Sequence, residues 1–315
     1  MTIRLARRED ISVPRGGTLT KREQLLRLRF KRALFTMLLM VGVAIMLYPV
    51  CMRMYFSYRS VRLAESYAQA MENTPHAELD AAWDAARAYN VQHSVNNIVD
   101  PFGEDDAASH PDGEYSALLD PLGDGTMGYL DIPRIDQRLN IYHGTNDDAL
   151  ERGVGHLQGT SLPVGGESTR CVLSAHRGLP AAKLFTDLDQ LATGDMIYLH
   201  VLDKTLAYRV DDVQTVLPTE VKALDIVSGE DLLTLVTCTP YAVNTHRLLV
   251  TGHAVPYLAD EDQSANHALI VRAKLLLLVA AIVICLTIAF MAASQLVQIR
   301  REQTQPQGRH ARRDG

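Results

Sequence analysis

Apolar residues are concentrated near the two ends of the chain. Residues 33–51 (ALFTMLLMVGVAIMLYPVC) form an uncharged run of 19 residues, and residues 275–297 form a second run of 23. A helix rises about 1.5 Å per residue, so roughly 20 apolar residues cross the hydrocarbon core of a bilayer. The pattern therefore predicts two transmembrane helices.

The first apolar run also fits a secretory signal peptide, because a basic stretch precedes it. However, 19 residues are long for the apolar part of such a peptide, and no A-x-A-like cleavage site follows. We favour an uncleaved anchor at this position, with cleavage as the alternative.

Between the two runs, the pattern changes from helix to loop. Residues 52–95 are rich in Ala, Glu and Arg, which favours helix. Thr74 and Pro75 predict a break between two helices, with Thr74 as the cap and Pro75 in the first helical position. Residues 96–127 contain repeated Pro and Gly among acidic side chains, which predicts a long loop. Loops of this length in compact domains often act as lids.

From residue 128 onward, short apolar stretches rich in β-branched residues alternate with turn residues. This pattern predicts a mainly β fold that closes, or nearly closes, into a β-barrel. A helical interruption is expected at 180–191. The seven predicted strands are 128–135, 138–143, 170–176, 196–202, 205–216, 232–238 and 247–255.

The charge distribution predicts an orientation in the membrane. Residues 1–32 carry a net charge of +7 and residues 298–315 a net charge of +3, so subtraction from the chain total of −6 leaves −16 for the middle. Because basic flanks stay in the cytoplasm, both termini are predicted to be cytoplasmic and the acidic middle extracellular. The membrane explains the basic N-terminus better than nucleic acid does, so no nucleic-acid partner is predicted.

Two of the four cysteines lie outside the apolar runs. Cys51 and Cys285 lie in or beside the predicted membrane spans, which leaves Cys171 and Cys238. A single disulfide is a weak framework for a domain of this size, although extracellular domains usually pair their cysteines. Cys171 is expected in a strand core, and Cys238 needs a separate explanation.

Three side chains at strand ends suggest nucleophilic chemistry. Cys238 ends a predicted strand, His176 ends another, and Arg247 begins the strand that returns nine residues after Cys238. A thiolate can act as a nucleophile, an imidazole as an acid and base, and a guanidinium as the stabiliser of an oxyanion. Each residue alone fits a packing or surface role, and His143 and His253 compete with His176. Together, the three favour an active site.

At this point the residues resemble a known family. TLVTC (234–238), SAHRG (174–178) and LDIPRI (130–135) resemble segments of sortases, the membrane-anchored cysteine transpeptidases of Gram-positive surfaces. The resemblance runs from about residue 128 to 256. It implies an eight-stranded β-barrel in which Cys238 is the nucleophile, His176 the acid and base, and Arg247 the stabiliser of the oxyanion or substrate.

The resemblance extends to class C sortases, which polymerise pilins and carry a lid with an Asp-Pro-aromatic motif and a C-terminal anchor. Asp100-Pro101-Phe102 matches that motif. It implies a lid in which Asp100 pairs with Arg247 and Phe102 covers the thiol, while Pro101 fixes their relative aim. The implied partners are pilin subunits with an LPxTG-like sorting signal and an acceptor lysine. No cofactor and no metal are expected, because Arg247 cannot act as a metal ligand.

Three alternatives remain from the sequence. One is a sortase of another class that attaches proteins to the cell wall. Another is a non-catalytic, membrane-anchored β-domain in which Cys238 only packs. The third is an extracytoplasmic cysteine protease, in which water replaces the amine acceptor.

The predicted organisation has a sortase-like β-barrel flanked by two membrane helices. The segments are a basic cytoplasmic N-terminus (1–32), a transmembrane helix or signal anchor (33–51), N-terminal helices (52–95), a lid or linker loop (96–127), the catalytic β-barrel (128–258), a linker (259–274), a C-terminal transmembrane helix (275–297) and a cytoplasmic tail (298–315).

Overall fold

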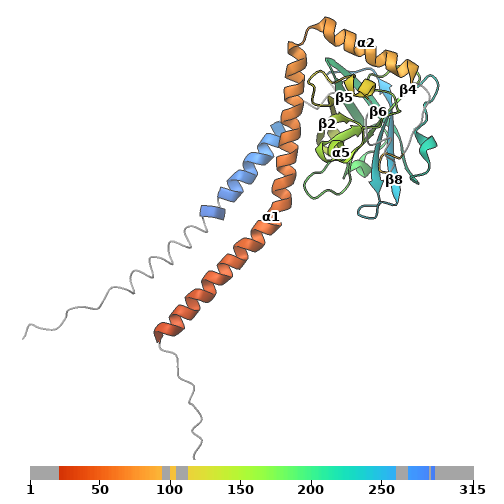
Figure 1. The fold of residues 1–315 in the computed structure, drawn as a ribbon. Helices are drawn as coiled ribbons and strands as arrows, with labels where there is room; N and C mark the ends of the chain where they lie inside the picture. The colour runs from red at the N-terminus through yellow and green to blue at the C-terminus, as the bar shows by residue number, and fades with distance from the viewer. Residues whose placement is uncertain (1–20, 94–99, 104–112, 260–268, 284, 288–315) are drawn as a thin grey trace, which may run out of the picture. The chain divides into compact units, whose positions relative to one another are not determined.

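The computed structural model describes residues 21–93, 100–103, 113–259, 269–283 and 285–287. The chain divides into two units, Met1–Pro49 and Val50–Gly315. The described part of the first unit is the beginning of helix α1 (Lys21–Asn73), whose apolar side chains are largely exposed. The second unit contains the rest of α1 and the β-barrel (Figure 1).

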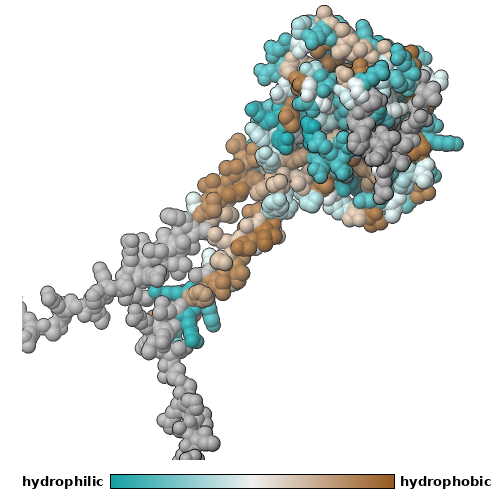
Figure 2. Space-filling model, in the orientation of Figure 1, coloured by the Kyte–Doolittle hydropathy of each residue, from teal (hydrophilic) through white to brown (hydrophobic). Residues whose placement is uncertain are grey.

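Two described helices are long and apolar enough to cross a membrane, Arg27–Asn73 and Leu269–Thr287. Figure 2 shows hydrophobic side chains along both. The first contains the predicted span 33–51. The second contains the start of the predicted span 275–297, whose last ten residues lie outside the described part of the chain.

Eight strands close into a barrel in the order β1-β2-β3-β4-β7-β8-β6-β5. The pairs β2–β3 and β4–β7 are parallel and the other pairs are antiparallel. This confirms the predicted mainly β, eight-stranded fold. The strands are β1 (Thr126–Ile132), β2 (Gln137–His143), β3 (Val154–His156), β4 (Thr169–Ser174), β5 (Met196–Val201), β6 (Lys204–Val216), β7 (Asp231–Thr239) and β8 (His246–Val255).

Short helices lie before β1 and between later strands. They are α4 (Gly113–Ala117), α5 (Asp147–Arg152) and three 3-10 turns: η1 (Pro133–Ile135), η2 (Leu188–Gln190) and η3 (Val221–Leu224). The helical interruption predicted at 180–191 is present only as η2, and the rest of that stretch contains turns and bends. Leu184 adopts a φ of 42°, a left-handed conformation that a continuous helix cannot include. Helix α4 interrupts the segment that was predicted to be a loop.

The predicted break between the N-terminal helices is confirmed, but its capping is different. α1 ends at Asn73 and α2 (His76–Gln92) begins after Pro75, which is the N-cap residue rather than the first helical residue. The Thr74 hydroxyl donates to the carbonyl of Ala70 within α1, so it does not cap α2. The first predicted helix is continuous with the apolar segment, since α1 runs through Pro49 without a break.

α1 and α2 are tied to the barrel. The Tyr67 hydroxyl donates to the carbonyl of Met127 at 2.9 Å and accepts from the backbone N–H of Leu202 at 2.9 Å. Leu79 and Trp83 of α2 join the barrel core, and α2 lies against one end of the barrel (Figure 1).

Alternation along the strands gives the sheet two apolar faces. Residues such as Leu173, Leu235 and Val250 point into the barrel and form the main core. Val172, Val236 and Leu249 lie on the opposite, outward face. There they form a second cluster with Leu157, which follows β3, and Leu224 of η3. Cys171 is buried in the main core, as predicted, and burial raises its pKa. The outward cluster is the surface on which the candidate site is built.

Candidate active site

Strand pairing brings the three predicted catalytic residues into one row. Cys238 of β7 pairs directly with Arg247 of β8. β4 runs parallel to β7 with Ser174 beside Val236, and the hydrogen bond from Ala175 N–H to the Val236 carbonyl continues that register. Continued two residues past the end of β4, this register would place His176 opposite Cys238.

The row lies on the outward face of the sheet. Side chains alternate along a strand, so Cys238 shares the face of Val236, and Arg247 shares that of Leu249. Both apolar residues belong to the outward cluster. Cys238 is 9% exposed and Arg247 is 8% exposed. The thiol and the guanidinium therefore lie at the end of an apolar groove, largely shielded from water.

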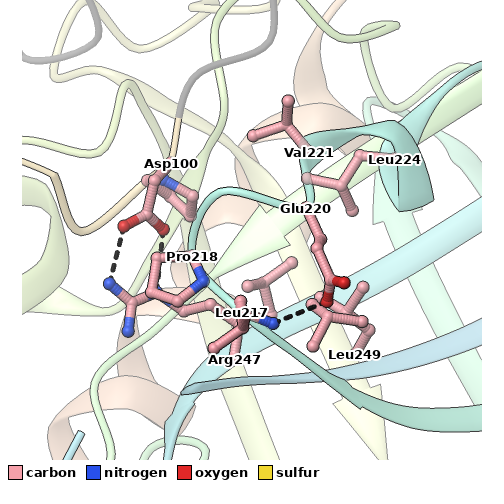
Figure 3. Close-up of a pocket in the computed structure, with 11 residues that line it drawn as sticks. Asp100, Leu217, Pro218, Glu220, Val221, Leu224, Arg247 and Leu249 are labelled. Carbon is pink, nitrogen blue, oxygen red and sulfur yellow. Dashed lines mark hydrogen bonds and ion pairs between the residues drawn. The ribbon is translucent and has the colours of Figure 1, made fainter. Parts of the chain in front are cut away.

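The Asp100–Pro101–Phe102 turn contacts two residues of this row. Arg247 donates from Nε to Asp100 Oδ1 at 2.8 Å and from Nη2 to Oδ2 at 2.6 Å, a bidentate ion pair (Figure 3). The Phe102 ring lies 5.2 Å from the Arg247 guanidinium carbon and 6.0 Å from the His176 ring, centroid to centroid. Gly103 N–H donates to the Asp100 carbonyl at 3.0 Å and closes a turn.

Pro101 and the apolar side chains of η3 fill the groove beside the ion pair. The space left among Asp100, Val216, Leu224 and Leu249 is about 10 Å³, room for about one water molecule (Figure 3). Glu220 in the same wall accepts from the backbone N–H of Leu217 at 2.8 Å. Little free space is thus left beside the Arg247 guanidinium.

Burial and charge keep the thiol and the imidazole neutral in this arrangement. Burial raises the pKa of Cys238, Arg247 opposes this shift, and Asp100 adds to it. Burial also lowers the pKa of His176. The Asp100 ion pair raises the pKa of Arg247 against the effect of burial. At neutral pH the site thus holds a thiol, a neutral imidazole and a guanidinium already bound to a carboxylate.

The competing histidines lie elsewhere. His143 is buried, with its two ring nitrogens 3.1 Å from the Gly125 carbonyl oxygen and 2.7 Å from that of Leu118. His253 pairs with Asp211 at 3.0 Å and lies six residues from Arg247 along β8. Within the described residues, no three His, Cys, Asp or Glu side chains form a cluster suited to a metal ion.

The sequence interpretation did not single out Arg177. Its Nη1 donates to the Thr239 hydroxyl at 3.0 Å and its Nη2 to Asp189 at 2.5 Å. Arg177 directly follows His176 in the chain, and Thr239 directly follows Cys238. The Arg177–Thr239 hydrogen bond therefore joins the residues next to the two predicted catalytic residues. The available signal was the arginine directly after the histidine in SAHRG.

Comparison with known proteins agrees with the geometry. The Sortase domain model matches residues 130–255. Sortase A of Streptococcus agalactiae is 30% identical over 148 residues, covering 46% of this chain and 58% of that protein. Sortase D of Bacillus subtilis is 30% identical over 126 residues, covering 40% and 61%. The matched region thus spans about three fifths of these curated relatives.

Solved structures match over a longer region. Sortase C of Streptococcus pneumoniae is 44% identical, with a TM-score of 0.59, and the match covers 63% of this chain and 98% of that one. Sortase C-1 of Actinomyces oris is 45% identical, with a TM-score of 0.55, covering 58% and 100%. The chain belongs to the sortase family of cysteine transpeptidases, and its structural neighbours are class C sortases.

Proposed function

We propose that this chain is a membrane-anchored transpeptidase that joins pilin subunits through lysine isopeptide bonds. The observation that carries the proposal is the row of His176, Cys238 and Arg247 beneath Asp100 and Phe102. The Streptococcus pneumoniae sortase C has been described with its pilin substrate specificity, and the similar sortase C1 of group B streptococcus belongs to pilus island 1. These neighbours favour a pilin substrate over a cell-wall acceptor.

The first half-reaction would form a thioester. Cys238 attacks the threonine carbonyl of an LPxTG-like signal while its proton passes to His176. The carbonyl oxygen becomes an oxyanion that accepts hydrogen bonds from Arg247. The C–N bond after the threonine then breaks, and His176 returns the proton to the leaving amine. The reaction thus proceeds through two acyl transfers, each with a lower barrier than a direct exchange of one amide for another.

The second half-reaction would transfer the acyl group to a lysine of another pilin subunit. The neutral amine attacks the thioester carbonyl and His176 accepts its proton. An amide C–N bond forms, the C–S bond breaks, and the thiolate takes the proton back. Because water competes as an acceptor, the apolar groove that shelters Cys238 favours the amine.

The Asp100–Pro101–Phe102 turn would act as a lid that blocks the first step. Asp100 already occupies both donors with which Arg247 would bind the oxyanion, and Phe102 lies beside His176. The lid must therefore leave before a sorting signal can bind. Its departure also frees the thiol from the Asp100 charge that raises its pKa.

The two apolar helices would anchor the enzyme in the cell membrane, with both termini in the cytoplasm and the barrel outside. Pilin precursors carrying the sorting signal would meet the enzyme at that outer surface. No cofactor is required, since each proton and acyl transfer is assigned to a side chain of this row.

Product analysis tests the proposal. The full chain in detergent, with Asp100 and Phe102 changed to Ala, is incubated with an LPxTG peptide, with or without a lysine peptide. Mass spectrometry should find an isopeptide-linked product that requires the lysine side chain. Only hydrolysed peptide in both reactions would indicate a protease. No cleavage by this variant, with an unreactive Cys238 thiol, would indicate a non-catalytic domain.

A further inference from the structure

The loop between β7 and β8 holds the part of Arg247 that Asp100 leaves free. Arg247 donates from Nη1 to the carbonyl oxygens of Asn244 and His246, both at 3.2 Å. Nη1 carries two N–H groups, so it can supply one to each carbonyl. The other edge of the guanidinium, formed by Nε and Nη2, pairs with Asp100 (Figure 3). The two sets of contacts use different nitrogens and do not compete.

The Asp100 carboxylate marks the edge of Arg247 that binds a negatively charged oxygen. An oxyanion formed at Cys238 would use the same two donors, Nε and Nη2, once Asp100 has left. Because the guanidinium is planar, hydrogen bonds at Nη1 also fix the direction in which Nε and Nη2 point. Among the described residues, the Asn244 and His246 carbonyls are the acceptors that remain for Arg247 after Asp100 leaves.

The position of the Asn244 carbonyl depends on an unusual backbone conformation. Asn244 has a φ of 60°, in the left-handed region, and Ala242 has a φ of 64°. The N–H groups of Val243 and Asn244 both donate to the Pro240 carbonyl at 3.0 Å, which closes the loop on itself. Residues with a Cβ seldom adopt this conformation, although Asn does so more readily than most. Such strain is often retained where a functional site needs it.

The side chain of Asn244 does not explain this conformation. It is exposed, and its amide forms no hydrogen bond with another described residue. Other residues attach the loop to the barrel. The Tyr241 ring lies against Gly178, where an added Cβ would come within 2.8 Å of the ring, and Thr239 accepts from Arg177. The contribution of Asn244 is therefore made by its backbone.

We infer that Asn244 is a positioning residue for thioester formation. Its left-handed backbone directs a carbonyl oxygen at Nη1 of Arg247, and this contact keeps Nε and Nη2 aimed at the oxyanion after Asp100 has left. Asn244 thus acts through Arg247 and does not touch the reacting atoms. The inference rests on the proposed function, since the oxyanion forms only if Cys238 attacks the sorting signal.

A graded series at position 244 tests the inference in the full chain with the lid disabled by Asp100→Ala and Phe102→Ala. Glycine adopts a positive φ freely, alanine at a cost and valine hardly at all. At saturating LPxTG peptide, the rate of thioester formation should stay within about twofold in Asn244→Gly, fall about threefold in Asn244→Ala and fall about twentyfold in Asn244→Val. The half-saturating peptide concentration should change by less than about twofold, because Arg247 acts on the oxyanion. Single-turnover mass spectrometry measures both quantities.

Ser168→Val is the matched control for a loss of stability. Ser168 also has a left-handed φ, of 61°, and precedes β4 at the end opposite His176. Its hydroxyl accepts from the Gly229 N–H at 2.9 Å. Ser168→Val should therefore lower Tm at least as much as Asn244→Val, and the rate of thioester formation should stay within about twofold of the lid-disabled parent.

A double-mutant cycle tests whether Asn244 acts through Arg247. In the Arg247→Lys background, Asn244→Val should lower the rate by no more than about twofold. An ammonium group has no planar pair of donors whose direction the Asn244 carbonyl could fix. Full additivity of the two substitutions would mean that Asn244 acts independently of Arg247.

Several results would overturn the inference and leave the proposed transpeptidase intact. These are an unchanged rate in Asn244→Val, an equal loss in Asn244→Gly, additivity in the cycle, or an equal loss of rate in Ser168→Val. If Asn244→Val does not fold, the comparison of Asn244→Gly with Asn244→Ala decides, and equal rates would overturn the inference. Failure of the lid-disabled parent to form a thioester would overturn the proposed function together with the inference.

Discussion

Two arginines on one sheet face illustrate how differently a buried guanidinium can be stabilised. Arg247 is held by a bidentate carboxylate, whereas Arg170 has a neutral hydroxyl and an open cavity beside it. Their pKa values shift in opposite directions, upward for Arg247 and downward for Arg170. The partner of Arg247 comes from a short turn 147 residues away in sequence.

The comparison suggests a common principle for this sheet face. A buried cation that lacks a permanent partner is destabilising, and an acceptor or a ligand that pairs with the cation offsets this cost. At the Cys238 end, Asp100 is the acceptor. At the Arg170 end, none of the described carboxylates accepts a hydrogen bond from the guanidinium.

Arg247→Lys should reduce the rate of thioester formation by about 100- to 1000-fold in the lid-disabled chain. Lysine keeps the charge but loses the planar pair of donors that binds an oxyanion. Single-turnover mass spectrometry measures the rate. Arg209→Lys, at an exposed site on β6, is the matched control and should retain the parent rate. A loss below about tenfold would remove Arg247 from the oxyanion role.

Asp100→Asn should accelerate thioester formation by about tenfold or more in the otherwise unchanged chain. The amide keeps the shape of the carboxylate but loses its charge, and breaking a buried ion pair is worth several kcal/mol. Burst kinetics with a sorting peptide give the rate. Asp189→Asn changes a carboxylate in an ion pair outside the lid and should give no acceleration. An unchanged rate in Asp100→Asn would mean that the lid does not limit access.

Much of this architecture is predictable from the sequence because it depends on local pattern. Seven strands follow from alternation and β-branched residues, and a short β-loop-β unit suffices to bring Arg247 back beside Cys238. Strand β3 has only three residues, Val154–His156, too few for a periodic signal. The pattern also does not predict helix α5, since its six residues make fewer than two turns.

Long-range pairing accounts for what the pattern could not predict. His176 meets Cys238 through the parallel register of β4 and β7, which belong to segments about 60 residues apart. The Asp100–Arg247 pair was expected only from the resemblance to class C sortases. Arg170 begins an ordinary predicted strand, and nothing local indicates that its guanidinium is buried beside a cavity.

Arg177→Met should lower kcat by about fivefold and leave KM unchanged. Its hydrogen bonds link the strand end that carries His176 to Thr239 and to Asp189, and a hydrogen bond of this kind contributes about 1 kcal/mol. Arg177→Lys should recover part of the rate. The pH–rate profile should also change, because the spacing of His176 and Cys238 is altered. If kcat and the free energy of unfolding both fall while the pH–rate profile stays the same, Arg177 has a structural role only.

The alkylation rate of the Cys238 thiol should depend on pH. The Asp100–Pro101–Phe102 turn should set the midpoint of this dependence, the pH at which the rate is half-maximal. Burial and Asp100 raise the pKa of Cys238, so alkylation of the wild type rises only at high pH. Asp100→Asn removes the negative charge that disfavours the thiolate, so its midpoint should move to lower pH. Rates with a small alkylating agent measure this shift. A midpoint moved to higher pH would contradict the assigned electrostatics.

The most direct measurement is intact mass spectrometry of the full chain after brief exposure to an LPxTG peptide. Wild type, Cys238→Ala and the variant with Asp100 and Phe102 changed to Ala are compared, each with peptide mapping. The account predicts an adduct that lacks the leaving segment, is attached to Cys238, is more abundant in the lid variant and is absent from Cys238→Ala. An adduct at another residue, or none in the lid variant, would contradict it.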